Sequence, residues 1–340
     1  MRTWSGEPFD VPPGYLNTPG IGVPPVRAAD AVATTVDRWR RGQTSAVEFD
    51  APLTAARAAW AALVGVDPSR VAVGATVSQL LANVASAVPD GTRVLAVRGE
   101  FTSVTFPFAA QADRGVTVTE TDPADLVDRA PDFDLVAVSV AQSADGTVAD
   151  LAGLRAAGTR VLLDVSQSLG WLPADLGWAD WVVGAGYKWL MTPRGASWLA
   201  VRPAAREWTR PVAAGWYAAH APWDSVYGLP PLLAEDAREY DLSPVWFAQV
   251  GAAAVLPWLA TLDIAAVRDH VVGLADDLLA RLDLPPRGSA IVAVDRPDAA
   301  DRLTAAGVRC SVRAGRARLG FHLYNTTEDV DIAARALRGR

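Results

Sequence analysis

The chain has 340 residues, of which 51% are hydrophobic and 20% are charged. This length allows a large buried core and exceeds the usual size of one domain, so we expect a large domain and a smaller one. The formal net charge is -7 and no run of basic residues occurs, which argues against nucleic acid and anionic membranes as partners. The single cysteine excludes an intramolecular disulfide, and the three histidines stand far apart, so no metal site is expected.

The first residues, MRTWSGEPFDVPPGY, have no basic start followed by an apolar run, so we expect no secretory signal. The sequence has no uninterrupted apolar run of about 18 residues, the length that a membrane helix needs. We therefore expect a cytoplasmic protein without a membrane span. Residues 1–25 are rich in proline and glycine and predict an extended arm laid over the body. Residues 26–260 are predicted to form the large domain and residues 261–340 the small C-terminal domain.

Short valine-rich runs alternate with helical patterns in the predicted large domain. Such runs are typical of strands buried on both faces, and the alternation favours a mainly parallel sheet covered by helices. The predicted strands are 71–74, 94–97, 116–119, 135–140, 161–164, 181–184 and 197–201. The predicted helices are 26–41, 53–64, 77–88, 151–157, 247–259 and 264–282. Residues 202–244 are irregular, and the tail from Ala290 predicts the order strand, helix, strand, strand, helix.

Asp164 ends one predicted strand and Lys188 follows the next, in the stretch VLLDVSQSLGWLPADLGWADWVVGAGYKWL. The connection between them is short, so both side chains are expected at the same edge of the sheet, where such folds bind ligands. A desolvated lysine is a good nucleophile, and a carboxylate can hold a pyridine nitrogen protonated. Pyridoxal 5′-phosphate (PLP) needs both groups. The pair alone equally fits a loop-capping aspartate and a solvated surface lysine.

A second motif, VAVGATVSQLLANVASAV, predicts a strand, a turn with glycine and a helix. Thr76 is a good N-cap residue, and Gln79 three residues later gives a capping-box pattern. The start of a helix offers free backbone N–H groups and a positive dipole end to a phosphate. Taken by itself, the motif is more often a capped helix that binds no ligand.

With these motifs in place, the chain resembles the class V aminotransferase and cysteine desulfurase group of fold-type I PLP enzymes. The resemblance runs from YLNTPG to FHLYNTTEDVD, and its most specific parts are LLDVSQSLG, GAGYKWLMTPRG and RLGFHLYNTTEDVDIAARAL. It implies an α/β, fold-type I PLP-dependent transferase fold, with a mainly parallel seven-stranded sheet in the large domain and a smaller C-terminal α+β domain. It also implies PLP as the cofactor and a homodimer with shared active sites.

The resemblance also implies roles for the residues that would hold the cofactor. Lys188 matches the Schiff-base lysine, and Asp164 matches the partner of the pyridine nitrogen. Gln167 matches the residue that hydrogen-bonds the phenolic oxygen of the cofactor. Thr76 falls on a phosphate-binding residue at the start of its helix, and the adjacent Ala75 is included among the cofactor-binding residues.

Further matches concern residues that would stack on the cofactor, reach the phosphate in the partner subunit, or bind the substrate. Phe101 falls where relatives stack a ring on the cofactor, although it also fits an ordinary core phenylalanine. Ser243 falls where a hydroxyl reaches the phosphate in the partner subunit. Arg318 matches the arginine that clamps the substrate carboxylate, a task that suits a planar guanidinium, and a surface arginine is its alternative. Asn17, in YLNTPG, is included among the substrate-binding residues.

Several positions depart from the pattern of the group. Tyr187 stands where many relatives have a histidine, and we include it among the cofactor-binding residues. Ala185 replaces a phosphate-binding serine or threonine, and Ser143 lies nearest to an asparagine of many desulfurases. The cysteine loop of the desulfurases is missing, because VRAG runs directly into RARLGF. Cys310 precedes that stretch and is expected to be a small core residue.

These observations predict a PLP-dependent enzyme that acts on an amino acid or an amino-acid-like amine through a Schiff base and a Cα carbanion. Lys188, once displaced by the substrate amine, is expected to be the general base at Cα. We expect aminotransfer. A carbon–sulfur lyase of the cysteine desulfurase type and an epimerase are alternatives because they share the carbanion. A catalytically silent PLP-binding protein is an alternative of another class, although such a protein would be free to lose Lys188, Asp164 or Arg318.

The irregular segment AGWYAAHAPWDSVYG, residues 214–228, is rich in aromatic residues. In relatives the corresponding region lies near the mouth of the active site and the dimer interface. We expect Tyr217 and its aromatic neighbours to shape the substrate pocket, with His220 or Asp224 as a polar contact. Packing of the subunit interface is the alternative.

Overall fold

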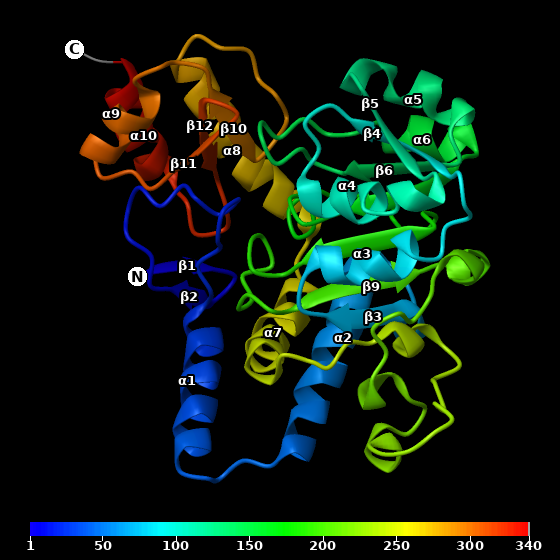
Figure 1. Cartoon of the computed structure of the whole chain (residues 1–340). Coiled ribbons are helices and arrows are strands. Elements are labelled where there is room, and N and C mark those ends of the chain that lie inside the picture. The colour runs from blue at the N-terminus through cyan, green and yellow to red at the C-terminus, as the bar shows by residue number, and fades with distance from the viewer. Residues whose placement is uncertain (339–340) are drawn as a thin grey trace.

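The structure, a computed structural model, describes residues 1–338, and its N-terminal segment lies beside the C-terminal helices (Figure 1). The predicted extended arm contains a short antiparallel hairpin of β1 (Arg2–Trp4) and β2 (Glu7–Phe9). Ser5 and Gly6 form its turn with positive φ angles, as a tight two-residue hairpin turn requires. The guanidinium of Arg2 pairs with the carboxylates of Glu328 and Asp329, which fixes the hairpin to the C-terminal helix.

The large sheet has seven strands in the order β3–β9–β8–β7–β6–β4–β5. Their bounds are β3 (Val71–Gly74), β4 (Arg93–Val97), β5 (Thr117–Thr121), β6 (Leu135–Ser139), β7 (Arg160–Asp164), β8 (Trp181–Ala185) and β9 (Ser197–Val201). Within residues 1–338, β9 is the one strand of this sheet that runs in the direction opposite to the others. The prediction of a mainly parallel seven-stranded sheet is therefore confirmed. The central strands β6, β8 and β9 are buried throughout, which explains their apolar sequences.

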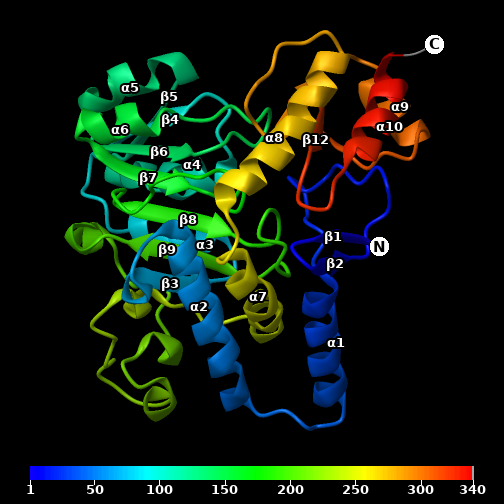
Figure 2. The same cartoon turned by 180° about the vertical axis from the view of Figure 1, so that it is seen from behind.

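Helices cover both faces of this sheet, as Figures 1 and 2 show from opposite sides. Their bounds are α1 (Val26–Arg40), α2 (Asp50–Val64), α3 (Val77–Ala85), α4 (Thr102–Ala109), α5 (Leu126–Arg129), α6 (Leu151–Ala157) and α7 (Trp246–Leu259). Successive residues of a strand enter different hydrophobic clusters: Ala72 packs with α3 and α4, whereas Val73 packs with α2 and α7. This alternation is the period of two that places neighbouring side chains on opposite faces.

The C-terminal part forms a second, antiparallel sheet in the order β10–β12–β11. Its elements are α8 (Ile264–Arg281), β10 (Ile291–Val294), α9 (Ala299–Ala305), β11 (Ser311–Arg313), β12 (Arg316–Gly320) and α10 (Thr327–Arg338). The predicted order of strand, helix, strand, strand, helix is confirmed. No single helix in residues 1–338 is long and apolar enough to cross a membrane. The helices α7 and α8 reach the required length and apolar composition only when taken as a pair, and this pair is bent by 98°.

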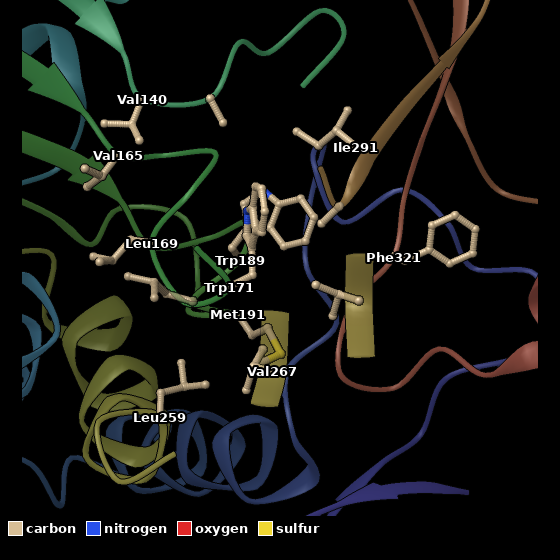
Figure 3. Packing of buried hydrophobic residues seen from close by; sticks show 14 of the residues in the cluster. Val140, Val165, Leu169, Trp171, Trp189, Met191, Leu259, Val267, Ile291 and Phe321 are labelled. Atoms are coloured by element: carbon tan, nitrogen blue, oxygen red, sulfur yellow. The ribbon is translucent and has the colours of Figure 1, made fainter. Parts of the chain in front are cut away.

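A continuous apolar core joins the two sheets and fixes the backbone next to Lys188. Figure 3 shows Trp171 and Trp189 between the large sheet and the small one, and their ring centroids are 5.7 Å apart. Val267 of α8 and Phe321, just after β12, belong to the same cluster. Because Trp189 directly follows Lys188 and is buried, the lysine stands on a rigid part of the chain.

Candidate active site

A cavity of about 260 Å³ lies at the edge of the large sheet where β3, β7 and β8 end. β7 and β8 are parallel, so Asp164, the last residue of β7, and Lys188, just after β8, reach the same edge. The lining includes many of the residues predicted to bind the cofactor: Ala75, Thr76, Phe101, Asp164, Gln167, Tyr187 and Lys188. The shared edge follows from the strand order, as the sequence pattern predicted.

The carboxyl group of Asp164 is buried against the floor of this cavity, with 4% of the residue exposed. Burial raises its pKa, while a hydrogen bond from the Ser166 backbone N–H (2.8 Å) and the nearby Lys188 oppose that rise. Asp164 and Lys188 form no ion pair with each other within residues 1–338. A buried carboxylate without a cationic contact is stabilised by a ligand that brings a protonated nitrogen, which the PLP ring does.

Lys188 presents its amine to the same cavity, and only 6% of the residue is exposed. Burial lowers its pKa to about 8, partly opposed by the Asp164 carboxylate and reinforced by Arg318. The ring centroid of Phe101 lies 5.2 Å from its Nζ. A lysine with this lowered pKa is a better nucleophile near neutral pH than an exposed one.

Lys188 is also the only lysine of the chain, because all the other basic residues among the 31 lysines and arginines are arginines. The sequence shows this feature, but the motifs described above do not depend on it. Guanidinium groups stay protonated in proteins and do not form Schiff bases, so arginine cannot replace lysine in that role. In a chain that uses arginine everywhere else, the single lysine lines the cavity.

The lowered pKa of Lys188 predicts how the cofactor-free protein takes up PLP. The unprotonated amine is the reactive form, so the rate of attachment should rise with pH and level off above a midpoint of about 8. An ordinary lysine would give a midpoint of about 10.4. Stopped-flow absorbance after mixing with PLP between pH 6 and 11 measures the midpoint. A midpoint above 10 would contradict the desolvated site.

Gln167 is held by three side-chain hydrogen bonds. Its Nε2 donates to the backbone oxygen of Pro19 (3.0 Å) and to the hydroxyl of Ser143 (3.2 Å). Its Oε1 accepts from the indole N–H of Trp189 (2.8 Å). Both amide hydrogens are therefore engaged, so the predicted bond to the phenolic oxygen of the cofactor requires the exchange of one of these contacts. That role stays a prediction.

Arg318 lies behind Ser143 and is 1% exposed. Its Nη1 donates to the backbone oxygen (2.5 Å) and the hydroxyl (2.9 Å) of Ser143. Its Nε and Nη2 are buried without a partner in the part of the chain that the structure describes. Burial lowers the pKa of Arg318 to about 10. Buried donors of this kind are costly unless an acceptor is supplied, and a carboxylate matches their geometry.

Asn17 lies beside the strand that carries Arg318, because it forms an isolated bridge with Gly320. Its side-chain oxygen is buried and has no partner among residues 1–338. Neither Asn17 nor Arg318 belongs to the lining of the cavity itself, from which Ser143 separates the arginine. The substrate-binding roles predicted for both residues stay predictions.

The start of α3 forms another wall of the cavity. Thr76 caps this helix, and its Oγ1 accepts from the backbone N–H of Gln79 at 3.3 Å. The Gln79 side chain accepts from the Thr76 hydroxyl (3.2 Å) instead of reaching the backbone N–H of Thr76, so the predicted capping box is only half formed. The backbone oxygen of Ala75 accepts from the Ser197 hydroxyl at 3.3 Å, which ties this turn to β9.

Two predicted residues lie away from the cavity within the chain. The hydroxyl of Tyr217 donates to Asp50 (2.7 Å), which also accepts from the indole N–H of Trp223 (2.6 Å). These contacts hold the aromatic segment against the start of α2, so the structure does not bring Tyr217 to Lys188. Ser243 is exposed and does not line the cavity either. Its predicted role concerns a partner subunit and stays a prediction.

The cavity also contains polar residues that the sequence analysis did not single out. Ser166 follows Asp164, and its Oγ accepts from the backbone N–H of Ala185 (3.0 Å), which ties the ends of β7 and β8 together. Arg194, in the TPRG turn after Lys188, and Ser197 at the start of β9 line another part of the wall. Arg194 and Ser197 both come shortly after Lys188 in the sequence. This position is the sequence feature from which their place in the site could have been predicted.

Comparisons with known proteins agree on the family. A model of the class-V aminotransferase family matches residues 33–305. The chain is 26% identical over 314 residues to an uncharacterized aminotransferase, YcbU, of Bacillus subtilis, with 83% of each chain covered. It is 27% identical to the isopenicillin N epimerase of Streptomyces clavuligerus, with 85% of each chain covered.

Solved structures of related enzymes share the fold. The cystine C–S lyase C-DES, in complex with cysteine persulfide, superposes with a TM-score of 0.83 at 20% identity, covering 95% of this chain and 97% of that one. The cysteine desulfurase CsdA of Escherichia coli gives a TM-score of 0.82 at 20% identity, covering 97% and 96%. The chain therefore belongs to the class V aminotransferase family of fold-type I, PLP-dependent enzymes.

Proposed function

We propose that the protein is an aminotransferase that uses PLP to act on the amino group of an α-amino acid. The observation that carries the proposal is the pair of Asp164 and Lys188, both buried at one cavity and not paired with each other. Bound PLP would supply an electron sink for negative charge at the substrate Cα. The family of the chain and its similarity to an aminotransferase support the same conclusion.

Each residue then has a defined task. Lys188 would hold the cofactor through Nζ, and Asp164 would keep the pyridine nitrogen protonated. Phe101, whose ring lines the cavity, would contact one face of the cofactor ring, and Thr76 with the start of α3 would face the phosphate. Arg318 would orient the substrate by binding its carboxylate through Nε and Nη2, the two groups left without partners.

Lys188 would also move the proton at the substrate Cα. Its pKa of about 8 leaves part of the population unprotonated near neutral pH, which suits a group that must accept a proton and return it. The buried position limits access of water to the reacting amine. Binding, orientation and proton transfer thus come from residues at one edge of the sheet.

A product screen tests the reaction type directly. The loaded enzyme is incubated with single amino acids, with and without a keto acid as amino acceptor. We expect a keto acid product whose formation depends on the acceptor. Sulfide from cysteine or cystine without an acceptor would assign a lyase instead. Accumulation of the opposite enantiomer without any keto acid would assign an epimerase. No product, despite bound cofactor, would support a silent PLP-binding protein.

Replacement of Cys310 by serine is expected to leave turnover within about twofold of wild type. Cys310 is half-buried, does not line the cavity, and burial raises the pKa of its thiol. These properties are the reverse of those of a nucleophilic cysteine. The measurement compares keto acid and sulfide formation by the two proteins. A Cys310→Ser protein that keeps its cofactor and its melting temperature but loses turnover would revive the desulfurase alternative.

We also propose that the enzyme is a cytoplasmic homodimer. Large apolar side chains are exposed on one loop, with Tyr227 at 93%, Leu229 at 90% and Leu232 at 66%. Contact with a second copy would remove them from water, and Ser243 would then face the cofactor phosphate of the partner. Light scattering should give twice the mass of one chain, and a monomer that turns over fully would contradict shared sites.

A further inference from the structure

Arg194 is an arginine of the cavity lining, whereas Arg318 lies behind Ser143. The guanidinium centre of Arg194 lies 5.5 Å from the ring centroid of Tyr187, and Lys188 Nζ lies 5.6 Å from the same ring. Arg194 lines the cavity and makes no ion pair or side-chain hydrogen bond within residues 1–338. A guanidinium with five donors and no acceptor is available to an anionic ligand.

Strand pairing places Arg194 at the same end of the cavity as the start of α3. Gly74 of β3 pairs with Ser197 of β9, and the Ser197 hydroxyl donates to Ala75. The turn that carries Arg194 immediately precedes β9, and the nine-residue helix α3 (Val77–Ala85) follows β3. Because the end of β3 pairs with the start of β9, the turn and the helix lie at neighbouring positions on the sheet edge. The first backbone N–H groups of a helix favour an anion.

Several side chains near the start of α3 offer no free donor to an anion. Ala75, Val77 and Ala185 line the cavity with apolar groups. The hydroxyl of Thr76 is engaged with Gln79, both as acceptor and as donor. A phosphate dianion bound here would therefore draw on the helix start and on Arg194, whose guanidinium lines the cavity without an ion pair within residues 1–338.

The other arginine near the site, Arg318, already has a proposed ligand. Arg318 contacts Ser143, which in turn accepts from Gln167, and the proposed function gives Arg318 to the substrate carboxylate. The buried amine of Lys188 also faces the cavity and makes no side-chain hydrogen bond within residues 1–338. A buried polar group without a partner indicates that the cavity binds a ligand. An enzyme of this kind binds two anionic groups, and the second one is the phosphate of the cofactor.

We propose that Arg194 binds the phosphate group of PLP. This inference rests on the proposed function, since it names a residue of the same site. The planar guanidinium can donate two parallel hydrogen bonds to phosphate oxygens, which a hydroxyl or an imidazole cannot do. Arg194 thereby gives the cofactor charge-assisted contacts that its apolar neighbours at this end do not provide.

The test compares PLP with pyridoxal, which lacks the phosphate, in binding to the cofactor-stripped full-length chain. Wild type, Arg194→Gln and Arg313→Gln are titrated with each ligand, and visible absorbance gives Kd. Arg313 is a matched control, because it is, like Arg194, an exposed arginine whose charge acts on Lys188, but it lies outside the cavity lining. Arg194→Gln should weaken PLP binding by roughly tenfold or more and leave pyridoxal within about twofold. Arg313→Gln should change neither Kd by more than about twofold.

Retained pyridoxal binding shows that the Arg194→Gln chain is folded with Lys188 in place. Equal weakening of both ligands by Arg194→Gln would overturn the inference, because it would mean that Arg194 acts on the lysine or on the fold. Unchanged binding of both ligands would also overturn it. A wild-type chain that binds neither ligand would instead refute the proposed function, so the two failures are distinguishable.

Discussion

Replacement of Lys188 by alanine is expected to lower turnover by about 10⁴-fold, the upper end of what a positioned acid–base group contributes. The loss should be this large because the same amine would hold the cofactor and transfer the Cα proton. No other lysine exists in the chain to take over either task. Keto acid formation by wild type and Lys188→Ala at saturating PLP measures the effect, with circular dichroism as the check on folding.

The variant Lys188→Arg distinguishes the need for a reactive amine from the need for a positive charge at this position. Arginine keeps a positive charge at the cavity but cannot provide an unprotonated nucleophile. We therefore expect Lys188→Arg to be as inactive as Lys188→Ala. If the arginine variant retained a tenth or more of the wild-type turnover, Lys188 would serve only as a positive charge in the site, and the proposed mechanism would be wrong.

Replacement of Asp164 by asparagine is expected to lower turnover on the order of a hundredfold, the size of a lost charge-assisted hydrogen bond at the reacting group. The amide has the same shape but cannot hold the pyridine nitrogen protonated. Asp164 forms no ion pair within residues 1–338, so its carboxylate is available to the protonated ring nitrogen, whose positive charge would oppose the burial that raises the pKa of Asp164. Turnover per bound cofactor is the quantity to measure.

Asp175→Asn is the matched control for Asp164→Asn. Asp175 lies on the connection between β7 and β8, and its carboxylate forms an exposed pair with Arg155. Surface pairs contribute about 0–1 kcal/mol, so this variant should remain fully active. If Asp164→Asn turned over within about threefold of wild type while fully loaded with PLP, another group would have to be the partner of the ring nitrogen.

The sheet was predictable because most of its strands, though not the edge strand β5, are buried on both faces, and their valine-rich runs have no helical period. The helix α4 (Thr102–Ala109) was not predicted. Its sequence, TSVTFPFA, combines β-branched and aromatic residues with Pro107, a composition that favours strands and breaks helices. Packing against α3 and the sheet overrides that local preference, which no local pattern reveals.

The site was predictable to the extent that it follows strand ends. Asp164 ends β7 and Lys188 comes shortly after the neighbouring parallel strand β8, so their proximity follows from topology. Tyr217 lies in an irregular segment, where the hydrogen bond to Asp50, 167 residues away, decides its position. The bridge from Arg318 through Ser143 to Gln167 likewise joins three distant parts of the chain. The single lysine, by contrast, can be read directly from the sequence.

Borohydride reduction of the PLP-loaded enzyme, followed by intact-mass and peptide analysis, tests the central claim most directly. Reduction makes a Schiff base permanent, and Lys188 is the only lysine that can form one. We predict one phosphopyridoxyl group per wild-type chain, on the peptide that contains Lys188, and none on Lys188→Ala or Lys188→Arg. An unmodified wild-type chain, or a group attached to the N-terminal amine or retained in the Lys188 variants, would contradict the assignment of this cavity as the PLP site.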